Sequence, residues 1–299
     1  MELLRLIENI RAPLWDTVFS AVSFLGDELF ISIVIMAVYW CINKRSAYTL
    51  GMALFLSGLA VQSMKICFRI PRPWVLEPDF KPVAAAAEQA TGYSFPSGHT
   101  QSSTAFFGSL GALTKHKPLK VFCFALPFLV AFSRMYLGVH TLTDVLASLV
   151  ISFLFVFIAY KIMSDDSANK KRDLILALGM VAFAAIVIIL ASSLYIMGII
   201  EARYLSDSLK ASGAGLGFAV GFYIERNYIC FSVKSKNILW QLLKLSCGAV
   251  GVLAIQEGIK LLAGTGLAID TLRYFLVSIW VFALFPLLIK RFFEFRDDS

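Results

Sequence analysis

Residues 174–200, "LILALGMVAFAAIVIILASSLYIMGII", form a run with no charged side chain. A helix of roughly 20 apolar residues is enough to cross the roughly 30 Å hydrocarbon core of a bilayer. Residues 46–64 form a second run of sufficient length. The 299-residue chain is 59% hydrophobic and only 16% charged, with a mean hydropathy of +0.76. A soluble core of this size could not bury so much apolar surface, so the sequence predicts a multi-pass membrane protein.

Shorter charge-free runs accompany these two along the whole chain. Runs of this length also occur in buried helices of soluble proteins, but the charges that end them can snorkel toward the membrane surface, so we count them as spans. The predicted fold is therefore all-α, a polytopic membrane helical bundle with about nine transmembrane helices. The shorter runs are residues 29–43, 100–114, 121–133, 145–160, 211–224, 245–256 and 274–289.

The N-terminal residues 1–26 are predicted to lie at the membrane interface. The first eleven residues, "MELLRLIENIR", alternate charge with Leu and Ile instead of building the apolar stretch of a cleavable signal peptide. This alternation is typical of an amphipathic interfacial helix. Residues 12–26, "APLWDTVFSAVSFLG", are compatible both with a continuation of this segment and with a short re-entrant piece.

The most polar interruption inside the chain is "MSDDSANKKRD", residues 163–173. It mixes both signs of charge and contains no apolar run, so it is the best candidate for a domain boundary. We expect a five-span core at residues 27–163, which holds all three histidines, and a four-span extension at residues 164–299. The sequence offers no role for the extension.

The net charge of +7 could suggest nucleic acid, but its distribution favours a membrane topology instead. When alternate loops are assigned to opposite sides, one side holds 16 of the 27 Lys and Arg residues. The positive-inside rule makes that side cytoplasmic. We therefore predict a multi-pass protein of the bacterial cytoplasmic membrane with no nucleic-acid partner. The loops on the basic side are residues 44–45, 115–120, 161–172, 226–244 and 290–296.

The five cysteines indicate neither a metal site nor a disulfide framework. Four of them fall in or beside apolar runs and Cys67 lies near a helix end, with no spacing typical of metal ligands. Small buried apolar residues are the simplest interpretation. The prediction is that the protein binds no metal and no other cofactor.

Three polar clusters lie at the predicted outward ends of spans, and one of them pairs a histidine with a carboxylate. His140 and Asp144 are spaced i, i+4 at the start of a helix, so both project from one face. The carboxylate could accept a hydrogen bond from one ring nitrogen and leave the other as a nucleophile. A hydrogen-bonded pair that merely caps a helix is the alternative.

The second cluster is Pro96-Ser97-Gly98-His99, in "YSFPSGHTQ" (residues 93–101). Ser97 is a good N-cap for a helix beginning near Gly98, whose first amides would face an anion. Gly98 would allow close backbone approach, and His99 could donate a proton to a leaving oxygen. Taken alone, the stretch is also an ordinary capped helix start.

Three cations complete the set: Lys65, Arg72 and Arg134. They are costly near a membrane core because no acidic residue of matching periodicity pairs with them. Arginine forks and a lysine point charge suit a tetrahedral phosphoryl group. Snorkelling explains any one of these cations but not three around two histidines, so the ensemble predicts a phosphate site.

The combined pattern resembles the phosphatidic acid phosphatase type 2 superfamily. All three signatures of that family are matched without a substitution, within residues 65–144: Lys65-x6-Arg72-Pro73, Pro96-Ser97-Gly98-His99, and Ser133-Arg134-x5-His140-x3-Asp144. Soluble vanadium haloperoxidases share these signatures. The membrane spans favour the integral membrane lipid phosphatase branch.

The resemblance implies a role for each matched residue. It implies that His140 attacks phosphorus to form a phosphohistidine, that Asp144 orients it, and that His99 protonates the departing alkoxide. It also implies that the charge neutralisation needs no metal. Residues 27–163 would be the catalytic phosphatase core. The residues that would hold the phosphoryl oxygens are Lys65, Arg72, Arg134, Ser97 and Gly98.

The leading hypothesis is a membrane phosphatase that hydrolyses a lipid phosphate or pyrophosphate monoester on the extracytoplasmic face, with a phosphorylated lipid as substrate. A phosphotransferase with an alcohol acceptor, a sugar-phosphate phosphatase and a non-catalytic phospholipid-binding or transport protein are alternatives. Pure binding would need the cations but not His99, His140 and Asp144 together. The sequence leaves the particular lipid and the oligomeric state open.

Overall fold

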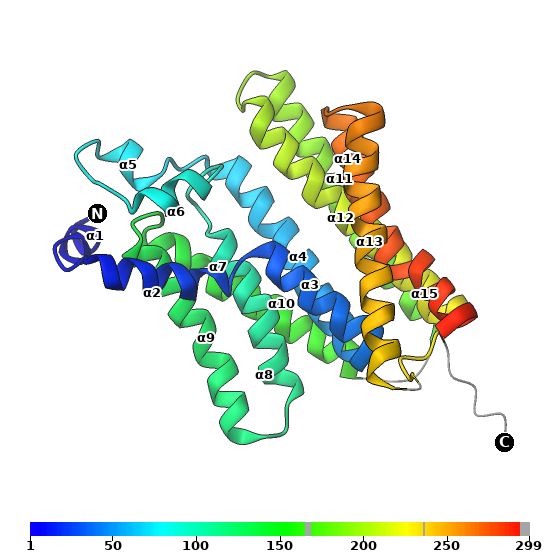
Figure 1. The fold of residues 1–299 in the computed structure, drawn as a ribbon. Coiled ribbons are helices and arrows are strands. Elements are labelled where there is room, and N and C mark those ends of the chain that lie inside the picture. Colours follow the sequence, from blue (N-terminus) through cyan, green and yellow to red (C-terminus); the bar gives the residue numbers. More distant parts are fainter. Residues whose placement is uncertain (165–168, 236, 294–299) are drawn as a thin grey trace. The chain divides into compact units, whose positions relative to one another are not determined.

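The computed structural model describes residues 1–164, 169–235 and 237–293, and within these ranges every regular element is a helix (Figure 1). The chain divides into two compact units. The first comprises Met1–Ile33 and Met52–Ile162, and the second comprises Val34–Gly51 and Met163–Ser299. The all-α prediction is confirmed for the described residues.

The first unit contains the N-terminal helices and the segments that carry the predicted site. Three of its helices, α3, α4 and α10, continue into residues assigned to the second unit. The elements in chain order are α1 (Glu2–Glu8), α2 (Pro13–Phe24), α3 (Glu28–Ala37), α4 (Lys44–Phe68), α5 (Pro73–Leu76), α6 (Ala84–Gln89), α7 (Gly98–Ser103), the π-helical turn η2 (Thr104–Gly108), α8 (Ser109–Leu113), α9 (Lys117–Tyr136) and α10 (Leu142–Ser164).

The second unit contains the remaining helices, several of which include π-helical turns. These elements are η1 (Val38–Ile42), α11 (Lys170–Ile196), α12 (Ala202–Ile224), η3 (Glu225–Ile229), α13 (Ile238–Ala263), α14 (Leu267–Ile279), η4 (Trp280–Leu284), α15 (Phe285–Leu288) and η5 (Ile289–Phe293).

Six helices in the described residues are long and apolar enough to cross a membrane. A seventh span is possible if Pro13–Phe24 and Glu28–Ile42, which are bent by 44° at their break, form one broken span or a re-entrant loop. The prediction of about nine spans is therefore not confirmed. The six helices are Lys44–Leu76, Lys117–Tyr136, Leu142–Ser164, Lys170–Ile196, Ile238–Ala263 and Leu267–Phe293.

Three of the shorter charge-free runs account for the difference between nine predicted spans and six candidate spans in the described residues. Residues 29–43 become only one arm of the bent pair. The run at 100–114 lies in α7, η2 and α8, which end at Leu113 and are too short together for a full span. The run at 211–224 lies in α12, where glycines and serines beside Asp207 and Lys210 reduce the hydropathy.

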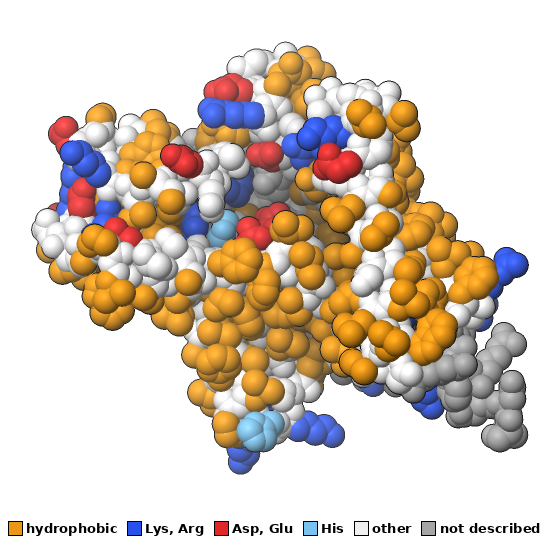
Figure 2. Space-filling view, in the orientation of Figure 1, with side chains coloured by type: hydrophobic (Ala, Val, Ile, Leu, Met, Phe, Trp, Pro, Cys, Tyr) orange, Lys and Arg blue, Asp and Glu red, His pale blue; other side chains and the backbone are white. Residues whose placement is uncertain are grey.

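Hydrophobic side chains cover much of the visible surface, as expected for helices in contact with lipid (Figure 2). Ile196, Leu261 and Leu262 are more than 80% exposed, at 82%, 86% and 88%. Exposed apolar surface on this scale is unusual in a soluble monomer. It supports the prediction of a multi-pass membrane protein.

The N-terminal segment packs on α9 in the first unit. Leu4 and Ile7 of α1 are buried with Phe80 and Tyr136 in one apolar cluster. The ring centroids of Phe19, on α2, and Tyr136 lie 4.3 Å apart. The predicted helix near the N-terminus is therefore present, while its interfacial location stays a prediction.

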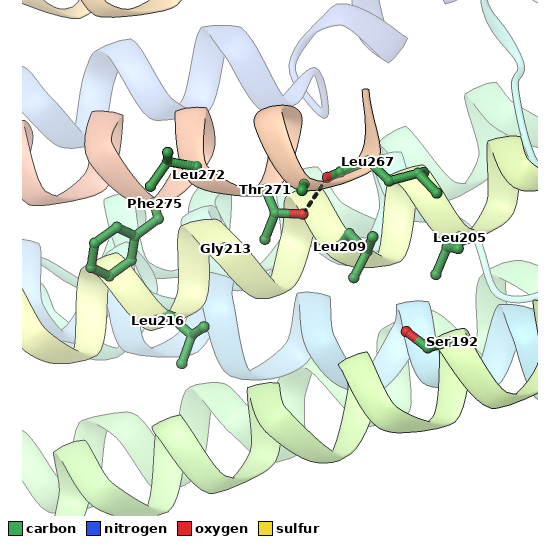
Figure 3. A pocket seen from close by; sticks show the side chains of 10 residues that line it. Ser192, Leu205, Leu209, Gly213, Leu216, Leu267, Thr271, Leu272 and Phe275 are labelled. Carbon is green, nitrogen blue, oxygen red and sulfur yellow. Dashed lines mark hydrogen bonds between the residues drawn. The ribbon is translucent and has the colours of Figure 1, made fainter. Parts of the chain in front are cut away.

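Close packing of α12 on α14 and η4 organises the second unit. A Cβ atom on Gly213 would lie 2.4 Å from the Thr271 carbonyl oxygen, and one on Gly217 would lie 2.5 Å from that of Phe275. Small residues spaced four apart allow membrane helices to approach closely in this way. Beside this contact, α11, α12 and α14 border an apolar groove of about 560 Å³ (Figure 3).

Candidate active site

All eight predicted site residues belong to the first unit, and the turn between α9 and α10 presents the first of them. Gly138 has φ +77°, and a Cβ there would lie 2.6 Å from Arg11 and 2.9 Å from Phe80. Only glycine tolerates both the left-handed backbone and this crowding. The turn carries His140 to the start of α10, where it is only 2% exposed.

Asp144 is buried in the first turn of α10 and faces His140. Its Oδ2 atom lies 3.5 Å from His140 Nδ1, which is longer than a normal hydrogen bond. The same oxygen accepts hydrogen bonds from the Thr141 backbone N–H at 2.8 Å and from Ser94 Oγ at 2.6 Å. Thr141 Oγ1 in turn accepts from the Asp144 backbone N–H, which completes a capping box. Asp144 therefore caps the helix and also approaches the histidine.

The other ring nitrogen of His140 is in contact with Arg72. Arg72 Nη1 lies 3.0 Å from His140 Nε2 and also donates to the Val139 carbonyl at 3.0 Å. A guanidinium can only donate, so Nε2 must be the acceptor. In the neutral ring the proton is then on Nδ1, the nitrogen that faces Asp144. This tautomer leaves a lone pair on Nε2, as a nucleophile requires.

Loop carbonyls on the N-terminal side of α7 hold two of the three predicted cations. Arg72 donates through Nε to Gly92 O at 3.1 Å and through Nη2 to Thr91 O at 2.6 Å. Lys65, near the end of α4, donates to Tyr93 O at 3.1 Å. The segment 91–93 thus sets the positions of both side chains through its backbone.

Arg134 enters the site from the end of α9. It is 3% exposed, and its Nη1 atom donates to Ser23 Oγ of α2 at 2.6 Å. Its Nε atom is buried without a hydrogen-bond partner in the part of the chain that the structure describes. A buried N–H without a partner is costly, so this donor is suited to a ligand oxygen.

The second cluster begins α7, as the sequence predicts. Ser97 is the N-cap, and its Oγ atom accepts from the Thr100 backbone N–H at 3.4 Å. Ser148 Oγ of α10 donates to Ser97 O at 2.8 Å, which ties the two helix starts together. A Cβ on Gly98 would meet only Glu28 Oε1, at 3.9 Å, so there is room for a ligand beside the first turn.

The electrostatic environment links both histidines to the same cations. Burial, followed by the charges of Arg134, Lys65 and Arg72, lowers the pKa of His99 to about 3. Burial and the charges of Arg72, Arg134, Lys65 and His99 hold the pKa of His140 well below its usual range. Both rings are therefore neutral at pH 7. The three sequence clusters converge on one group of positive charges suited to an anion.

Sequence reasoning missed several groups that shape this site. Ser94 contacts Asp144, Ser23 contacts Arg134, and the carbonyls of residues 91–93 hold Lys65 and Arg72. Ser94 lies inside the quoted stretch "YSFPSGHTQ", but a loop serine has no spacing that marks it. Within residues 1–164, 169–235 and 237–293, no three His, Cys, Asp or Glu side chains gather as metal ligands would.

Two family models match the chain. Residues 46–168 match the PAP2 superfamily, and residues 209–295 match the transmembrane extension of PAP2 superfamily phosphatases. The first match contains all eight predicted site residues. The second falls within the predicted C-terminal extension, residues 164–299.

Curated relatives are similar to this chain. Phosphatidylglycerophosphatase B of Bacillus subtilis is 27% identical over 162 residues, which is 50% of this chain and 75% of that protein. The lipid A 4'-phosphatase of Bacteroides thetaiotaomicron is 25% identical over 215 residues, 62% of this chain and 93% of that protein.

The crystal structure of a transmembrane PAP2-type phosphatidylglycerolphosphate phosphatase from Bacillus subtilis aligns over 56% of this chain and 85% of that one. Its TM-score is 0.48 and its sequence identity 23%.

Together, the matched signatures and the two family models give the identification: the chain belongs to the PAP2 superfamily of phosphatases.

Proposed function

We propose that this protein hydrolyses a lipid phosphate monoester at the extracytoplasmic face of a membrane, through a phosphohistidine on His140. The observation that carries the proposal is the contact of Arg72 Nη1 with His140 Nε2 while His140 Nδ1 faces Asp144. It gives a neutral imidazole whose nucleophilic nitrogen lies beside a phosphate-binding cation. The curated relatives support a lipid substrate because they are named as lipid phosphatases.

Binding would begin with the phosphoryl oxygens approaching Lys65, Arg72 and Arg134. The Arg134 Nε–H has no partner among the described residues and would donate to one oxygen. Arg72 would donate hydrogen bonds to the substrate in place of those to His140 and the loop carbonyls. This exchange frees His140 Nε2 for attack. Lys65 would add a point charge, and the amides at the start of α7 would approach the remaining oxygen beside Gly98.

The first chemical step is then an in-line displacement. His140 Nε2 forms a bond to phosphorus as the bond from phosphorus to the lipid oxygen breaks, and His99 gives a proton to that oxygen. Asp144 stabilises the positive charge that develops on the His140 ring. In the second step water attacks phosphorus, His99 takes a proton from the water, and the Nε2–P bond breaks to release phosphate.

Substrate binding itself would prepare His99 as an acid. Burial and three nearby cations lower the pKa of His99 to about 3. A phosphate monoester brings up to two negative charges beside these cations and offsets them. A nearby negative charge raises the pKa of a histidine, so His99 would take up a proton when the substrate binds.

The outward orientation rests on the loop charges: alternation of the nine predicted spans places 16 of the 27 basic residues in loops on the other side. A site at the ends of membrane helices favours amphiphilic substrates whose phosphate lies at headgroup depth. Phosphatidate, phosphatidylglycerophosphate and sphingoid phosphates share this chemistry.

The test is phosphate release by the purified full-length protein in detergent, measured on these lipid phosphates and on a sugar phosphate. We expect turnover of at least one lipid phosphate in EDTA, inhibition by orthovanadate, and loss of activity in His140→Ala. Preferred turnover of the sugar phosphate would replace the lipid assignment. Transfer to an added alcohol without phosphate release would indicate a phosphotransferase, and binding without turnover would contradict an enzymatic role.

A further inference from the structure

We propose that Ser94 is a positioning residue of the active site, whose hydroxyl holds the Asp144 carboxylate against His140. Ser94 Oγ donates to Asp144 Oδ2 at 2.6 Å, and both residues are buried, with exposures of 0% and 1%. A short hydrogen bond to a buried carboxylate is among the stronger interactions of a side chain. This inference rests on the proposed function of the site.

The position of Ser94 is itself fixed by the backbone. Its N–H donates to Ile70 O at 2.9 Å, in the segment between α4 and Arg72. The residues just before it provide the carbonyls that hold Arg72 and Lys65. Residues 91–94 therefore form one strap in which each residue contacts a site side chain, and Ser94 is the member that contacts Asp144.

The bond matters because one carboxylate oxygen serves three neighbours. Asp144 Oδ2 accepts from Ser94 and from the Thr141 N–H, and it lies 3.5 Å from His140 Nδ1. When His140 attacks phosphorus its ring becomes cationic, and Nδ1–H must then approach this oxygen more closely. Two fixed donors keep the oxygen in place for that approach and limit the negative charge that His140 experiences.

Loss of the Ser94 hydroxyl therefore has an expected kinetic signature. In Ser94→Ala the carboxylate is less well fixed, so we expect kcat to fall about 10- to 100-fold, the range for one bond to a charged group. KM should change little, because Ser94 does not contact the predicted phosphate donors. A carboxylate with one donor fewer stabilises the protonated His140 ring better, so the acid limb of kcat/KM should move to higher pH. The other charged or titratable groups facing His140, namely Arg72, Arg134, Lys65 and His99, are unchanged.

Matched variants separate positioning from packing. Ser94→Cys keeps the side-chain volume but not the strong donor, so it should behave like Ser94→Ala, whereas Ser94→Thr keeps the hydroxyl and should recover most of kcat. Ser103→Ala is the control, because Ser103 is equally buried but donates only to Thr100 O of its own helix, at 3.1 Å. It should keep the wild-type kcat and pH profile.

A double variant tests whether Ser94 acts through Asp144. Adding Ser94→Ala to Asp144→Ala should cause little further loss of kcat, because the partner is already absent. Full additivity, or a raised KM with unchanged kcat in Ser94→Ala, would overturn the proposal. If Ser94→Thr does not fold, the Ala and Cys variants and the double variant still test the positioning role of Ser94.

Failure of the proposed function can be told apart from failure of this inference. If wild-type protein turns over none of the phosphates, the proposed function fails, but the ring nitrogens of His140 can still be titrated by NMR. Ser94→Ala should then raise the pKa of His140 relative to the wild type. An unchanged titration would overturn the positioning role of Ser94.

Discussion

Nε2 of His140 lies 3.0 Å from Nη1 of Arg72, and because a guanidinium only donates, this contact determines which ring nitrogen carries the proton. The neutral ring is protonated on Nδ1, facing Asp144, and holds its lone pair on Nε2. One side chain therefore both selects the tautomer of the predicted nucleophile and lies where a phosphoryl oxygen would bind.

The first prediction concerns Arg72. In Arg72→Lys the charge remains, but the planar fork that contacts His140, Val139 and the loop carbonyls is lost. We expect kcat/KM to fall about 10- to 100-fold for each charge-assisted bond lost. The matched control is Arg69→Lys. Arg69 lies close to Arg72 in the sequence, but its Nη1 atom donates to Ile66 O, at 3.1 Å, and Ile66 is not a predicted site residue. Equal losses of kcat/KM in the two variants would contradict the assignment.

The second prediction concerns His99 as the proton donor. General acid catalysis typically contributes about 10²- to 10⁴-fold, and its value depends on how poor the leaving group is. His99→Gln should therefore lose most of its activity on an alkyl phosphate but much less on p-nitrophenyl phosphate, whose leaving group needs no proton. The measurement is kcat for both substrates. A loss of the same size on both would indicate that His99 only binds or packs.

The third prediction concerns pH and stability. The pKa values of His99, at about 3, and of His140 lie below that of an unfolded histidine, about 6.5. Between these values the unfolded chain binds more protons than the folded one, so stability decreases as pH falls from about 6.5 toward 3. The melting temperature in detergent should follow this trend, and His99→Gln should reduce the slope.

The fourth prediction concerns helix packing in the second unit. A Cβ on Gly217 would lie 2.5 Å from Phe275 O and 2.6 Å from Ser278 Cβ, while one on Gly179 would meet nothing within 4 Å. Gly217→Ala should destabilise the protein by about 1–3 kcal/mol through overpacking. Gly179→Ala should be neutral or slightly stabilising. The readout is thermal unfolding in detergent, and equal effects of the two substitutions would refute the close contact of α12 with α14.

Sequence reasoning anticipated the elements of the site whose chemistry depends on residue type. Histidine, arginine and lysine at fixed spacings are rare in apolar surroundings, so Lys65, Arg72, Arg134 and the two histidines were recognisable. Ser97 was recognisable as an N-cap because it precedes a helix start after proline. Asp144 caps α10 through Thr141 and also faces His140, so its geometry is compatible with both interpretations.

The parts that the sequence did not predict depend on backbone atoms and three-dimensional packing. The carbonyls of residues 91–93 that hold Lys65 and Arg72 would be present in any amino acid, so they carry no signature. The predicted number of nine spans is not confirmed, because a charge-free run does not report helix length. The helical run from Gly98 ends at Leu113, and α12 uses its glycines for helix contacts.

The most direct test of the account is the identification of the covalent intermediate. A single turnover on a ³²P-labelled lipid phosphate, quenched in base to preserve phosphoramidates, can be digested and sequenced by mass spectrometry. We predict label on Nε2 of His140 in the wild type, and none in His140→Ala. Turnover that leaves no labelled histidine under conditions where a phosphohistidine standard survives, or label on any other residue, would contradict the central claim.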